Sequence, residues 1–196
     1  MMGWIFTVGR ILGFGVAGGV RPALTLAVIG AMARIGIGPH VLGPFRFLDH
    51  WVTILILAGL AIFESKFDSV PTLACIQDRL LMPWRTGAGA VAAAATIGHG
   101  TLGLVIGLVL GAMAAFMGQA AKYGHRPSSG PAGLAFALVS LSEDLFAFGG
   151  AVATALYSLL GYAFFGLNVW LVAWLRIRRR HKYRRRRARA TPQRGA

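Results

Sequence analysis

The sequence is poor in the residue types on which most soluble enzymes and redox proteins depend. It holds one cysteine, Cys75, which excludes a disulfide within the chain and any metal motif built from paired cysteines. Acidic residues number only six, and charged residues make up 13% of the chain, about half the share found in a typical soluble domain. No P-loop, Gly-x-Ser-x-Gly elbow or His-x-x-x-His pair occurs. We therefore expect no bound metal, no cofactor and no enzyme activity.

Apolar residues dominate what is present. They make up 56% of the 196 residues, which leaves too little polar surface to cover a soluble core of this size. A spanning helix needs about 20 apolar residues. Runs of that kind predict an all-α polytopic transmembrane bundle over residues 1–175, with about five or six membrane elements, some of them broken or half-crossing.

Basic residues are concentrated at the C-terminal end. Eleven of the twenty Lys and Arg residues lie at or after Arg176, with no acid among them. Because basic segments beside a span stay on the cytoplasmic side, residues 176–196 predict a cytoplasmic tail, disordered after its first turns, on a multi-pass protein of a bacterial inner membrane. The side of the N-terminus stays open. We expect the tail to bind anionic lipid head groups through Arg178, Arg179, Arg180, Arg184 and Arg185.

Other partners of the tail are less favoured by its composition. Nucleic acid is not expected, because Tyr183 is the one aromatic residue available there to stack on bases. No motif in the sequence indicates which small-molecule substrate it would take, and a homo-oligomer is compatible with the sequence.

Glycine and proline interrupt the apolar runs at three places. Gly19 and Pro22 flank Arg21 and predict that Ile11–Ala33 is kinked or broken into half-helices. Gly98, His99 and Gly100 divide the charge-free stretch 86–121 into a short helix and a full one, after which we expect a loop from Lys122. A further break is expected at Gly166–Asn168, because residues 145–175 are long for one helix. Broken backbone at membrane depth needs protein or water around it, so these points are candidate sites.

Charged residues within or beside the apolar runs carry the chemical signal. Arg21 is the expected counter-charge for Glu143 and Asp144, which lie between two apolar runs. Adjacent helical residues point about 100° apart, so we expect one of these two acids to face a site while the other caps or pairs. Glu64 and Asp68 share a helical face and predict a second cluster. A substrate, proton or cation pathway, an anion site at Arg21, and purely structural ion pairs all remain open.

Three segments together resemble a known family: Gly19-Val20-Arg21-Pro22, then Glu64 and Asp68 with Pro71, then Ser140 to Leu145. The chain resembles domain-of-unknown-function family 4126, a bacterial membrane-protein family, from about Ile11 to Leu175. The resemblance implies a polytopic membrane protein and no established activity. Apolar runs opening at 21–24 and 130–133, each followed by an acidic pair, also suggest a weak inverted repeat.

These observations predict a transporter or permease-like protein for a small polar or lipid-linked solute, with proton coupling as one option. The alternative is a non-transporting assembly or scaffold partner whose intramembrane ion pairs are structural. A membrane enzyme ranks third.

Overall fold

All the regular elements that can be described are helices. In a computed structural model of the chain, the structure describes residues 2–41, 43–68, 80–97, 100–125 and 134–190. The helices in these ranges confirm the expected all-α class. They are α1 (Met2–Val20), α2 (Pro22–Arg34), the 3-10 helix η1 (Gly43–Asp49), α3 (Trp51–Asp68), α5 (Met82–Ala94), α6 (Gly100–His125), α7 (Leu134–Leu156) and α8 (Leu160–Ala190).

Four of these helices are long and apolar enough to cross a membrane. The spans are Gly3–Val20, Gly100–Lys122, Ala137–Leu156 and Leu160–Arg178. A fifth arises if η1 and α3, which meet at a 71° bend, form one broken span. The chain is therefore a multi-pass integral membrane protein, and five crossings match the lower end of the expected number. With 13 residues, or about 20 Å, α2 is too short to cross a hydrocarbon core of about 30 Å by itself.

The predicted break near Arg21 is present and involves a single residue. Arg21 leaves helical geometry, with φ −139° and ψ 85°, and Pro22 opens α2 as its first helical residue. A proline disfavours helical backbone in the residue before it, which explains why the break falls at Arg21. The α1 helix begins at Met2 and spans before the break, so the two pieces are a full helix and a short one, and not two halves of one span.

Small residues bring α1, α5 and α6 into close contact around the centre of the bundle. A methyl group at Gly19 would overlap the backbone of Ala115, and one at Gly18 would lie 2.7 Å from the Cα of Gly89. Gly107 and Gly111 press in the same way against α5. Gly107 and Gly111 of α6 therefore serve helix packing, as small residues commonly do in membranes. The segment Gly3–Val20 is 56% buried, whereas Leu160–Arg178 is 22% buried, so α1 is the central helix and α8 lies at the edge.

Two expected helix boundaries are wrong. The α8 helix runs without interruption through Gly166 and the fully buried Asn168, and the break lies instead at residues 157–159. At 23 residues, α7 is already about 34 Å long and has crossed the hydrocarbon by that point. Arg10 of α1 donates a hydrogen bond to the Ser158 hydroxyl (2.8 Å) and fixes this turn. Lys122 also does not open a loop, because α6 continues to His125.

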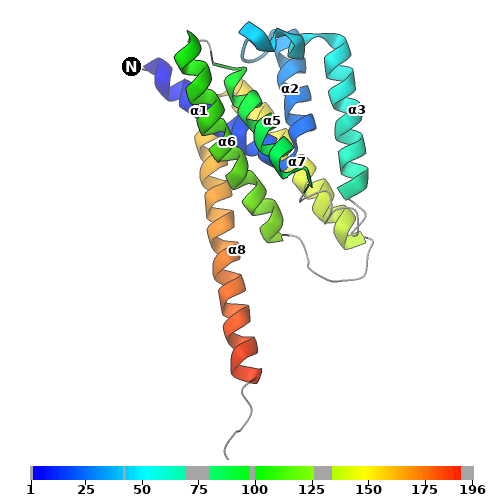
Figure 1. The fold of residues 1–196 in the computed structure, drawn as a ribbon, viewed down its shortest axis with the longest axis vertical. Helices are drawn as coiled ribbons and strands as arrows, with labels where there is room; N and C mark the ends of the chain where they lie inside the picture. The colour runs from blue at the N-terminus through cyan, green and yellow to red at the C-terminus, as the bar shows by residue number, and fades with distance from the viewer. Residues whose placement is uncertain (1, 42, 69–79, 98–99, 126–133, 191–196) are drawn as a thin grey trace, which may run out of the picture.

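The helices alternate in direction, so many of their ends meet at one end of the bundle. Figure 1 shows the N-terminus at the opposite end from the point where α6 finishes, and α8 projecting past that point. The α8 helix ends at Ala190, so it includes the beginning of the basic segment 176–196, which was expected to become disordered after its first turns. Gly100, with φ 51°, starts α6, while Gly98, His99 and the second segment of the suggested repeat lie outside the described residues.

Candidate functional site

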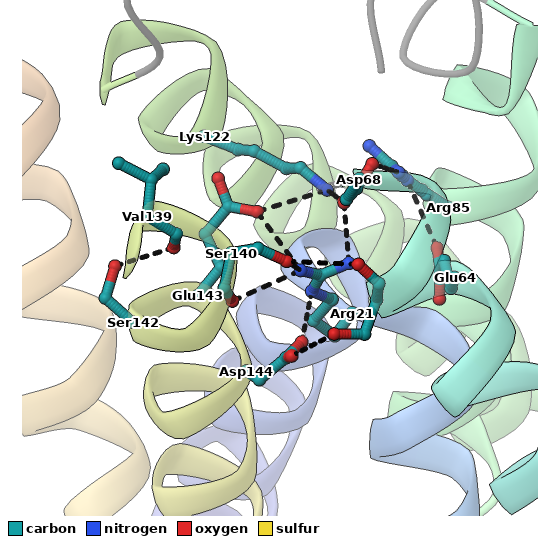
Figure 2. Close-up of polar contacts among 11 residues, drawn as sticks. Arg21, Glu64, Asp68, Arg85, Lys122, Val139, Ser140, Ser142, Glu143 and Asp144 are labelled. Atoms are coloured by element: carbon teal, nitrogen blue, oxygen red, sulfur yellow. Dashed lines mark hydrogen bonds and ion pairs between the residues drawn. The ribbon is translucent and has the colours of Figure 1, made fainter. Parts of the chain in front are cut away.

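Arg21 forms the centre of a buried network of charged side chains. Its Nη1 donates to Asp68 Oδ2 (2.6 Å), and its Nε pairs with Asp144 Oδ1 (2.6 Å). Its Nη2 donates to the Ser140 hydroxyl (2.7 Å) and lies 3.6 Å from Glu143 Oε2. The guanidinium fork thus reaches α3 with one arm and α7 with the others, as Figure 2 shows. The break in the helix at Arg21 places this side chain between those two elements.

Asp68, the last residue of α3, links Arg21 to a second cation. Lys122 Nζ of α6 donates to Asp68 Oδ2 (2.6 Å), the same oxygen that accepts from Arg21. Lys122 also lies 3.4 Å from Glu143 Oε2. Each of these two cations therefore contacts more than one carboxylate.

A third cation, Arg85, extends the network toward α5. Its Nε is 3.5 Å from Glu64 Oε1, and its Nη2 is 3.8 Å from Asp68 Oδ1. Arg85 lies in the first turn of α5, and its side chain is fully buried. Glu64 and Asp68, one turn apart on α3, thus share one guanidinium.

Glu143 and Asp144 both reach the network from the interior of α7, not from a boundary between two helices. The Glu143 side chain is 7% exposed and the Asp144 side chain 23%. The Ser65 hydroxyl donates to Asp144 Oδ2 (2.7 Å) on the outer side. Both acids pair with Arg21, because its broad guanidinium bridges the 100° between them, and of the two Glu143 also lines the adjoining cavity.

Burying this many charged side chains costs free energy unless opposite charges pair with one another. Four carboxylates and three basic groups of the described chain lie within one network, and six of these seven side chains are at most 7% exposed. Removing an ion from water costs several kcal/mol even after relaxation, and attraction between partners offsets this only in good geometry. The pairs at 2.6 Å meet that condition. The network therefore ties the α1–α2 junction to α3, α5, α6 and α7.

A cavity of about 240 Å³ adjoins the network on the side of Lys122 and Glu143. The described residues that line it come from four helices, namely α1, α6, α7 and α8. They comprise the charged pair, one hydroxyl and four apolar side chains: Val20, Ala121, Lys122, Ser142, Glu143, Phe146 and Leu171. Ser142 is exposed, so the cavity reaches the surface of the bundle.

The structure joins residues that sequence patterns separate. The predicted pairing of Arg21 with Glu143 and Asp144 is present, whereas the predicted second cluster of Glu64 and Asp68 is wrong, because both belong to the same network. Sequence reasoning overlooked Arg85 and Lys122. They border the charge-free stretch 86–121 on its two sides, and folding that stretch into the antiparallel pair α5 and α6 returns both ends to one place. The position of these two basic residues at the two ends of one charge-free stretch was the signal in the sequence.

Other predicted positions lie apart from the network. Arg178 is exposed, with its guanidinium 3.9 Å from the ring centre of Trp174, and Arg180, two residues further on, is also exposed. Arg179, Arg184 and Arg185 lie on the same helix, and their binding to head groups stays a prediction. Within the ranges that the structure describes, no three His, Cys, Asp or Glu side chains are placed to hold a metal ion.

Comparison with known proteins identifies the family and no activity. The model of the family described as "Domain of unknown function (DUF4126)" matches residues 8–178. The chain has no match among the curated proteins or among the solved structures. Because the match covers most of the sequence, the chain belongs to this family.

Proposed function

We propose that this member of the DUF4126 family is a transporter or permease-like protein for a small polar or lipid-linked solute, and that the charged network is its gate. The observation that carries the proposal is the sharing of partners within the network. Arg21 contacts three carboxylates, Lys122 contacts two, and Asp68 contacts three cations. Pairs can therefore be exchanged without leaving any of these charges buried alone, which a gate that opens and closes requires.

The backbone break at Arg21 supports the same function. Non-helical backbone at membrane depth is tolerated where protein or a water-filled space covers it, and broken helices commonly form transporter sites. Here the break positions the one side chain that reaches both α3 and α7. A substitution of buried ion pairs by apolar residues is often neutral or stabilising, so stability alone is a weak reason for so many buried charges.

We propose the proton as the coupling ion and the bacterial inner membrane as the location. Among the described members of the network, carboxylates outnumber basic groups by four to three. This excess of negative charge favours a proton over an anion as the coupling ion. The basic end of α8 projects from the end of the bundle that holds the network. The positive-inside rule then makes this end cytoplasmic and the network an inner gate.

Reconstitution into liposomes tests the proposal. Proton flux, followed with an internal pH-sensitive dye, and translocation of fluorescent phosphatidylethanolamine are measured for the wild type, for Glu143→Gln and for Asp144→Asn. We expect one or both fluxes to fall in the variants while the melting temperature in detergent stays near that of the wild type. Asp49→Asn is the matched control, because it makes the same chemical change in η1, outside the network.

The alternative is a membrane assembly or scaffold partner, and one observation favours it. Three pairs at 2.6 Å join the α1–α2 junction to α3, α6 and α7, which is also what a rigid structural clamp would show. If Glu143→Gln and Asp144→Asn leave both fluxes at the wild-type level and lower the melting temperature, the clamp explains the network and the transport proposal is rejected. A co-purifying protein that is lost with either variant would assign the assembly role.

A further inference from the structure

The cavity beside Lys122 and Glu143 combines features that point to one class of ligand. Its polar wall holds an ammonium and a carboxylate whose Nζ and Oε2 atoms are 3.4 Å apart. Its remaining wall is mostly apolar, with Val20, Phe146 and Leu171. A ligand that fills such a site needs both a charged part and an apolar part, as a membrane lipid has.

The position of the cavity along α8 matches the depth of lipid head groups. Leu171 precedes Arg176, the first residue of the basic segment, by about 7 Å of helix rise. The polar region on each side of a bilayer is of similar thickness, since about 30 Å of hydrocarbon lies within a total of 40–45 Å. Lys122 is likewise in the last turns of α6. The charged wall therefore lies where a phospholipid head begins, with the apolar wall toward its chains.

The charges on the wall select among head groups. An anionic head group would be attracted by Lys122 and repelled by Glu143, so a head group carrying both charges is the better complement. A primary ammonium can donate hydrogen bonds to the Glu143 carboxylate, whereas a quaternary ammonium cannot. Recognition of quaternary ammonium groups typically uses a cage of aromatic rings, and among the described residues that line this wall Phe146 is the one aromatic side chain.

We propose that this cavity binds a phospholipid with a zwitterionic head group that ends in a primary ammonium, as in phosphatidylethanolamine. The phosphate lies at Lys122, the ammonium at Glu143, and the acyl chains leave along Phe146 and Leu171. The Ser142 hydroxyl donates to the Val139 carbonyl (2.7 Å), so its oxygen is oriented to accept from the ligand. That the bound lipid is also the transported solute rests on the proposed function, while its binding stands without it.

Binding is measured on the full chain in detergent by native mass spectrometry. Dioleoyl phosphatidylethanolamine, phosphatidylcholine and phosphatidylglycerol are added one at a time at equal concentrations. Since a hydrogen bond to a charged group is stronger than one between neutral groups, we expect phosphatidylethanolamine to bind at least about tenfold more tightly than phosphatidylcholine. Equal binding of all three lipids, or a preference for phosphatidylglycerol, would overturn the proposal.

Two variants on α8 test the position of the site without touching the charged network. Leu171→Trp places a larger side chain in the cavity, and Leu167→Trp makes the same change on an exposed part of α8 outside it. We expect Leu171→Trp to reduce phosphatidylethanolamine binding at least about tenfold, the full size of the expected preference, and Leu167→Trp to leave it unchanged. Wild-type binding by Leu171→Trp would place the lipid elsewhere and reject the site.

Glu143→Gln tests the head-group preference itself. Its neutral amide should bring the affinities for phosphatidylethanolamine and phosphatidylcholine within about threefold of each other, because the ammonium loses its charged partner. A retained preference would exclude Glu143 as the selecting group. Selective binding without translocation of the fluorescent lipid would reject transport of this lipid and keep the site. Translocation that Leu171→Trp leaves unchanged, although the variant has lost binding, would keep both the site and transport but separate the two.

Discussion

Arg21, at the junction of α1 and α2, donates a hydrogen bond of 2.6 Å from Nη1 to Oδ2 of Asp68 at the end of α3. Arg21 follows the last residue of α1, and Asp68 is the last residue of α3. Because Pro22 forces Arg21 out of helical geometry, its side chain is directed across the gap between helix ends. The pair shows how a local backbone rule produces a long-range charged contact.

Replacing Arg21 should be the most damaging single change in the network. Arg21→Met leaves Asp68 and Asp144 without their shortest contact to a guanidinium, and breaking a buried pair in this way costs about 3–5 kcal/mol. We expect a clear fall in melting temperature, measured by thermal unfolding in detergent. The melting temperature of Arg21→Lys should lie between those of Arg21→Met and the wild type, because the single ammonium of lysine cannot serve three oxygens at once.

Lys66→Met is the control for that change. It also removes a cation from the end of α3, but Lys66 is exposed, so the effect should stay within about 0.5 kcal/mol. If Arg21→Met and Lys66→Met lower the melting temperature equally, the stability of the network does not depend on its central guanidinium.

The contact between α1 and α6 predicts different effects for two glycine substitutions. Gly19→Ala would push a methyl group into the backbone of Ala115 and should cost about 1–3 kcal/mol. Gly59→Ala, in the interior of α3, has nothing within 4 Å of the added methyl and should stabilise its helix by about 0.5–1 kcal/mol. Chemical unfolding of the two variants measures the difference, and equal stability would mean that α1 and α6 are not in contact at Gly19.

Alternating helix directions predict that the two ends of the chain lie on opposite sides of the membrane. Replacing the single cysteine, Cys75→Ser, gives a background in which Gly3→Cys and Arg180→Cys can be labelled separately. A methyl at Gly3 meets nothing within 4 Å, and Arg180 is exposed, so both changes should be tolerated. A membrane-impermeant maleimide applied to intact cells should label Gly3→Cys and leave Arg180→Cys unlabelled until the membrane is opened. Labelling of both from the same side would contradict the arrangement of the seven α-helices described.

The exposed arginines at the end of α8 should attract anionic lipid. Each basic residue near an anionic surface contributes about 1 kcal/mol, so Arg180→Gln should lower the enrichment of phosphatidylglycerol around the protein in mixed vesicles. The difference should shrink at high salt, because exposed charges are screened over about 8–10 Å. Arg46→Gln, in η1, removes the same charge outside the basic segment and should have a smaller effect. An equal effect of the two substitutions would remove the special role of the α8 arginines.

The sequence alone determined the class of structure and the local breaks. Long apolar runs with few charges are sufficient for membrane helices, because hydrocarbon excludes unsatisfied backbone. Pro22 was sufficient for the break at Arg21, since its effect on the preceding residue is local. Glycine was a poorer guide, because Gly166 lies inside a continuous helix whereas Gly19 is required for contact with another helix.

Only the tertiary structure decided which charges meet. Glu64 and Asp68 were readable as a pair on one helical face, yet their partners are set by where other helices begin and end. Arg85 and Lys122 become neighbours of the network because α5 and α6 run antiparallel, a relationship that depends on packing between small residues far apart in sequence. A local rule fixes the helix break at Arg21, whereas the desolvation of charge rewards one particular arrangement of the helix ends in space.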